Sequence, residues 1–140
     1  MDISLWLGRV QKIEKRIRQL KDARENARQF LYVSSAFPKG ERVQVSRKNY
    51  AEEHMVKYLA YDEKLRVEIA RLYQVKAEII DAISKVGDDM LCAVLTGYYI
   101  NGKQFSQIAE ELGYSNRQIT RLHQKALQIL KDVLECHLVL

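Results

Sequence analysis

The chain has 140 residues, of which 47% are hydrophobic and 29% are charged, a composition typical of a soluble folded protein and not of a disordered one. One proline and six glycines leave few helix breakers, so we expect an all-α protein. No apolar run approaches the roughly 20 residues of a membrane span, and the first residues lack a signal peptide's pattern.

The net charge of +5 is unevenly distributed along the chain. Residues 1–31 carry eight Lys or Arg against four Asp or Glu, and residues 32–49 carry four against one. Residues 50–86 carry six against seven, and residues 87–140 carry five against six. The basic excess therefore lies in the first third of the chain.

A helix is expected over residues 2–31, because its apolar residues alternate steps of three and four as in a coiled coil. Arg24 is the one charged residue on that stripe. Residues 32–48 contain Pro38 and Gly40 and are expected to form a loop. The stripe comprises Ile3, Trp6, Val10, Ile13, Ile17, Leu20, Arg24, Ala27 and Leu31.

A second long helix is expected over residues 49–86, with Asn49 as its cap and Glu52 completing a capping box. Its apolar stripe is interrupted by Lys76 and comprises Leu65, Ile69, Leu72, Ile79, Ile83 and Val86. The two helices predict a helical hairpin arm over residues 1–86, with an intermolecular coiled coil as the competing arrangement.

Residues 87–140 are expected to form a separate helix-turn-helix domain. Asp88 caps a short apolar helix over residues 89–100, and Asn101-Gly102 forms a turn. A two-turn helix over 105–112 then ends at Gly113, which can adopt a positive φ. Ser115 caps the next helix in a box with Gln118. Its expected buried stripe is Ile119, Leu122, Ala126, Ile129 and Val133.

The outward face of that last helix is the predicted functional surface. It has no acidic residue between Asn116 and Lys131, and Arg, Gln and Asn side chains are those that read bases and phosphates in the major groove. The alternative is an ordinary solvated polar face. The predicted DNA-binding residues are Ser115, Asn116, Arg117, Gln118, Thr120, Arg121, Gln124 and Lys125.

Three short stretches carry a resemblance to a known family. They are Tyr99-Ile-Asn-Gly-Lys103, Ile108-Ala-Glu-Glu-Leu-Gly-Tyr-Ser115 and Arg117-Gln-Ile-Thr-Arg-Leu-His123 followed by Ala126-Leu127. Over about residues 79–130 the sequence resembles the RinA/ArpU-type phage transcriptional regulators, whose helix-turn-helix is similar to region 4 of bacterial sigma factors. The spacing from Ser115 to His123 is one residue shorter than in the usual sigma-factor segment. The resemblance implies a phage or prophage activator of late genes that acts with the host RNA polymerase.

Nothing in the sequence predicts an enzyme. The three histidines and two cysteines lack metal-ligand spacing, so no metal or cofactor is expected. The expected partners are double-stranded DNA, host RNA polymerase and a second copy in a homodimer, without a membrane partner, in the bacterial cytoplasm. Two alternatives are a protein-interaction module that uses the arm and a small terminase-like DNA-packaging subunit.

Overall fold

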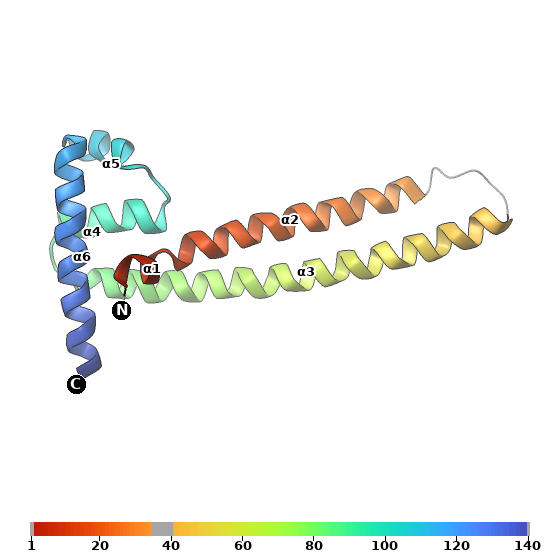
Figure 1. The fold of residues 1–140 in the computed structure, drawn as a ribbon, viewed down its shortest axis with the longest axis horizontal. Helices are drawn as coiled ribbons and strands as arrows, with labels where there is room; N and C mark the ends of the chain where they lie inside the picture. Colours follow the sequence, from red (N-terminus) through yellow and green to blue (C-terminus); the bar gives the residue numbers. More distant parts are fainter. Residues whose placement is uncertain (1, 35–40, 140) are drawn as a thin grey trace. The chain divides into compact units, whose positions relative to one another are not determined.

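The computed structural model describes the backbone of residues 2–34 and 41–139, and the side chains of residues 2–31 and 49–136. Within those backbone ranges there are six α-helices, one π-helical turn and no strand, which confirms the prediction of an all-α protein (Figure 1). The elements are α1 Ile3–Leu7, α2 Arg9–Ser34, α3 Glu41–Ser84, α4 Asp89–Leu95, η1 Thr96–Ile100, α5 Phe105–Leu112 and α6 Asn116–Val139. In the described ranges, no helix combines the length and apolar character needed to cross a bilayer.

The predicted first helix is divided at Gly8 into α1 and α2. Asp2 caps α1, because its Oδ1 accepts hydrogen bonds from the backbone N–H groups of Ser4 at 3.0 Å and Leu5 at 3.4 Å. The predicted coiled-coil stripe faces inward through both helices, and the structure adds Leu7 to it. The buried members are Ile3, Leu7, Val10, Ile13, Ile17 and Ala27.

The loop predicted over residues 32–48 is wrong in its extent. Helix α2 continues to Ser34, and α3 begins at Glu41, eight positions before the predicted cap Asn49. Val43 and Val45 do not prevent a helix here, because β-branched residues cost a helix only a few tenths of a kcal/mol each. Because Asn49 lies inside α3, no helix begins there, and Asn49 is not a helix cap. Residues 35–40, including Pro38 and Gly40, lie outside the described residues.

Contacts divide the chain into two compact units, of which unit 2 comprises residues 13–71. In unit 2, the α2 and α3 segments pair antiparallel within the chain (Figure 1). The Arg16 guanidinium lies 3.4 Å from Glu68, and Arg24 Nη1 donates to Asp62 Oδ1 at 2.8 Å. Arg24, the charged residue on the apolar stripe, is therefore accommodated by an ion pair across the helix pair.

The inward face of α3 differs in part from the predicted stripe. Leu65, Ile79 and Ile83 are buried as expected. Val75 is also buried, next to the position where Lys76 interrupts the pattern. Glu68 takes an inward position in unit 2, beside the predicted Ile69, because Arg16 and Arg71 both approach its carboxylate.

Unit 1 comprises residues 1–12 and 72–140. Helices α4 and α5 both pack on α6, and α1 also contacts α6. Asp88 caps α4 as predicted, since its Oδ1 accepts from the N–H groups of Met90 at 2.9 Å and Leu91 at 3.1 Å. The predicted domain boundary after Val86 concerns independent folding, which the contacts do not test, so that boundary stays a prediction.

The single helix predicted over residues 89–100 is α-helical only to Leu95, after which η1 forms a π-helical turn. Gly97 lies in this turn, where a Cβ atom would come within 3.2 Å of Cγ1 and Cδ1 of Ile108. The widened turn and the absent side chain together allow α5 to pack closely against this segment.

Candidate nucleic-acid interface

Helices α5 and α6 are joined by a tight turn at residues 113–115, as the sequence predicts. Gly113 adopts φ +76° and ψ 28°, and its N–H donates to the carbonyl of Ala109. Ser115 and Gln118 form the predicted capping box: Gln118 N–H donates to Ser115 Oγ at 3.2 Å, and Ser115 N–H donates to Gln118 Oε1 at 2.9 Å. Both helix ends are therefore defined by local interactions.

The direction of α6 is determined by the apolar cluster beneath it. Ile119 is fully buried with Val94, Ile108 and Ala109, and Leu122 packs at the edge of the same cluster. Ala126 and Leu130 continue the buried side of α6. Leu130 was not on the predicted stripe, and Ile129 and Val133 are only partly buried.

The eight predicted DNA-binding residues share one exposed surface around the first three turns of α6. We call this surface the α6 polar face. Every one of its members is exposed: Ser115, Asn116, Arg117, Gln118, Thr120, Arg121, Gln124 and Lys125.

The charges on the α6 polar face are available for a ligand. Within the described part of the chain, Arg117, Arg121 and Lys125 make no ion pair. Thr120 differs, because its hydroxyl donates to the Asn116 carbonyl at 3.0 Å and is partly occupied by the helix itself. The face therefore presents three uncompensated cations.

A hollow of about 210 Å³ lies along one flank of the α6 polar face. Gln118, Arg121 and Lys125 line it together with Tyr114 and Leu122, two residues that the sequence analysis did not assign to the site. The exposed aromatic ring of Tyr114 in a two-helix turn was the signal that could have identified it. The hollow adds an apolar floor beside the cationic groups.

His123 packs against aromatic residues of η1 and α5. Its Nε2 lies 2.8 Å from the Tyr99 hydroxyl, and the rings of Tyr98 and Phe105 lie 5.5 and 5.0 Å from the imidazole. Burial lowers the pKa of His123 and is the main cause that raises the pKa of Tyr99. An uncharged imidazole in an aromatic cluster tethers α6 to η1 and α5.

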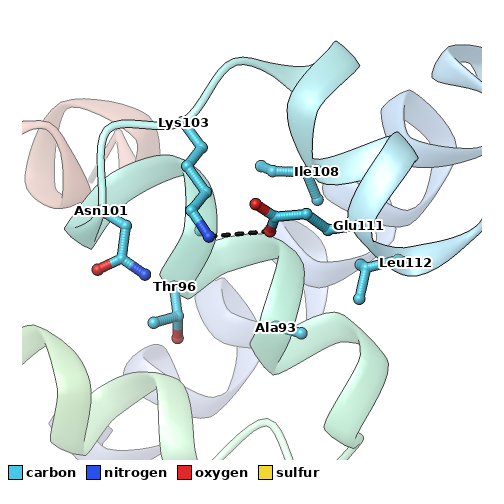
Figure 2. Close-up of a pocket in the computed structure, with 8 residues that line it drawn as sticks. Ala93, Thr96, Asn101, Lys103, Ile108, Glu111 and Leu112 are labelled. Carbon is cyan, nitrogen blue, oxygen red and sulfur yellow. Dashed lines mark hydrogen bonds and ion pairs between the residues drawn. The ribbon is translucent and has the colours of Figure 1, made fainter.

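A second pocket, of about 250 Å³, lies between α4, η1 and α5 (Figure 2). Its two charged groups satisfy each other, because Lys103 Nζ donates to Glu111 Oε2 at 2.8 Å. Thr96 and Asn101 supply the remaining polar groups. A charged ligand would have to displace this ion pair. The ion pair itself links the segment after η1 to α5.

Some basic residues of the predicted first helix form ion pairs within the protein. In unit 1, Arg9 Nη2 lies 3.3 Å from Glu78 Oε1. In unit 2, Arg16 and Arg24 pair with acids of α3. A part of the basic excess in residues 1–31 therefore neutralises acids of α3. Four exposed cations of α2 make no ion pair among the residues that the structure describes: Lys12, Lys15, Arg18 and Lys21.

Comparison of the chain with protein-family models, with characterised proteins and with solved structures gave no significant match.

Proposed function

We propose that this protein is a sequence-specific DNA-binding transcriptional regulator that reads the major groove with α6. The observation that carries the proposal is the α6 polar face, which is exposed, free of acidic residues and held by a helix whose opposite side is buried. A helix that enters the major groove needs this division between a base-reading side and a packing side.

Different members of the face suit different parts of DNA. Arg117, Arg121 and Gln124 point away from the buried side and match the donors that recognise guanine and adenine edges. Lys125, at the flank, suits a backbone phosphate, since backbone contacts orient the helix without reading sequence. The resemblance over residues 79–130 supports a narrower proposal, an activator of phage or prophage late genes that acts with host RNA polymerase.

The proposal is tested with a randomised duplex library, from which bound sequences are enriched and sequenced. On the enriched duplex, Arg117→Ala and Arg121→Ala should each cost roughly 1–3 kcal/mol of binding free energy and relax the base preference at one position. Lys125→Ala should weaken all sequences alike and lower the salt dependence by about one phosphate contact.

A matched control is Lys131→Ala, which removes the same charge as Lys125→Ala at the far end of the acid-free segment. Unchanged affinity in the double variant Arg117→Ala/Arg121→Ala, with the helix content intact, would disprove the proposal.

The competing function is a protein-interaction module that binds its partner through α2 and α3. The observation in its favour is the set of exposed lysines on α2, which lies outside the α6 polar face. Under this alternative, the full chain shows no shift of the duplex library even at low salt. Substituting Lys15 and Lys21 by alanine then abolishes partner capture, whereas the α6 variants retain it.

A further inference from the structure

The segment of α3 in unit 2 has apolar residues on two opposite sides. One side faces α2 through His54, Leu65 and Glu68, which are buried. At about 100° per residue, the opposite side holds a row that is largely apolar. The large members are well exposed, with 68% of Val56, 57% of Leu59 and 57% of Val67 accessible. We define this outer face by Val56, Leu59, Glu63, Arg66, Val67 and Ala70.

The centre of the outer face follows the spacing of a helix-pairing seam. Leu59, Glu63, Arg66 and Ala70 succeed one another by steps of four, three and four, which is the alternation that keeps residues on one seam between two helices. Leu59 and Ala70 are the apolar members of this row, and Val56 extends it by a further step of three. The face therefore has the spacing and the exposed apolar residues with which a second helix can pair.

The two charges on the seam favour a second copy of α3 as the partner and an antiparallel direction. If two copies of α3 meet antiparallel about a two-fold axis midway between residues 64 and 65, Glu63 of each copy faces Arg66 of the other. Leu59 of each copy then faces the small Ala70 of the other. A parallel pairing would place Glu63 against Glu63 and Arg66 against Arg66, which is unfavourable.

Arg66 makes an ion pair within its own helix and is still largely exposed. Its Nε lies 3.2 Å from Asp62 Oδ2, and the other oxygen of Asp62 accepts from Arg24 Nη1 at 2.8 Å. The Arg66 side chain nevertheless remains 76% accessible. Asp62 thus engages Nε of the guanidinium within the chain, and the exposed remainder of the guanidinium is open to a carboxylate of a second molecule.

We propose that a second copy of this chain docks antiparallel on the outer face of α3, with two reciprocal Glu63–Arg66 ion pairs at its centre. The dimer is isologous, because each copy contributes the same surface. This inference goes beyond DNA binding and does not depend on it, since it concerns a different helix and is tested without DNA.

The test is sedimentation equilibrium of the full chain over a range of concentrations. Glu63→Arg and Arg66→Glu should each weaken the dimer at least about tenfold, because each creates two like-charged pairs. An equimolar mixture of these two variants should dimerise again, since every pair that forms between them joins an arginine to a glutamate. The double variant Glu63→Arg/Arg66→Glu should dimerise by itself for the same reason.

Arg18→Glu, an exposed site on α2, is the control with the same charge change as Arg66→Glu and should leave the dimer unaltered. Circular dichroism verifies that all variants retain their helices. A monomeric wild-type protein at high micromolar concentration would overturn the proposal. So would single variants that dimerise as the wild type does, or a mixture that stays monomeric.

Discussion

Replacing Ile119 by alanine tests whether α6 is held by the apolar cluster formed with α4 and α5. Ile119 has no accessible surface and lies against Val94, Ile108 and Ala109. The change removes three carbon atoms, at about 0.8 kcal/mol for each buried carbon. A residual cavity adds to this loss, because neighbouring helices relax only partly, so we expect unfolding to become easier by about 3–4 kcal/mol.

The assay is urea unfolding followed by tryptophan fluorescence. Trp6 is the only tryptophan of the chain, and it lies in α1, which contacts α6 within unit 1. Its emission therefore reports on the unit that contains the substitution.

Two companion variants separate packing from surface effects. Ile119→Val removes a single methylene and should cost about 1 kcal/mol. Arg117→Ala lies on the exposed side of the same helix and should change stability by less than about 0.5 kcal/mol. A loss below about 1 kcal/mol for Ile119→Ala would refute the burial of α6 on this cluster.

Three further predictions concern the turn, the cap and the aromatic cluster. Gly113→Ala should lower the free energy of unfolding by about 1–2 kcal/mol in the same urea assay, because φ is +76° and an added Cβ would meet no other atom, so the strain is that of the backbone alone. Gly113→Asn should lower it less, and equal losses of stability in the two variants would contradict this reasoning. Ser115→Ala should cost about 1 kcal/mol by removing the hydroxyl that caps α6, whereas Ser106→Ala, at an exposed position in α5, should be nearly neutral. Because burial lowers the pKa of His123, the unfolded chain takes up a proton first, so stability should fall as the pH drops below about 6.5; His123→Gln should remove that part of the pH dependence, and an unaltered pH profile would exclude His123 as its source.

Local interactions made a large part of unit 1 predictable. The cap at Asp88, the left-handed Gly113 and the box between Ser115 and Gln118 all involve residues within four positions of each other. Such features depend on short-range geometry and hydrogen bonding, which the sequence displays directly. The buried stripe of the first helix was predictable for a similar reason, since its period is a property of the helix.

Features that depend on distant partners were not predictable in this way. Asn49 has the local signal of a cap, yet α3 begins at Glu41. Glu68 is buried although it is charged, because Arg16 arrives from a helix about 50 positions earlier. The bond between Tyr99 and His123 joins η1 to α6 and has no local signature.

For the candidate site, the sequence by itself determined which side chains α6 carries, that no acid lies among them, and where the helix begins. Only the tertiary structure decided which side of α6 is covered, because the burial of Ile119, Ala126 and Leu130 depends on contacts with other parts of unit 1. It also decided that Arg16 and Arg24 of the basic first helix pair with acids of α3. The physical reason is range: caps and periodicity act within a few residues, whereas burial and ion pairing depend on surfaces that meet only when the chain is folded.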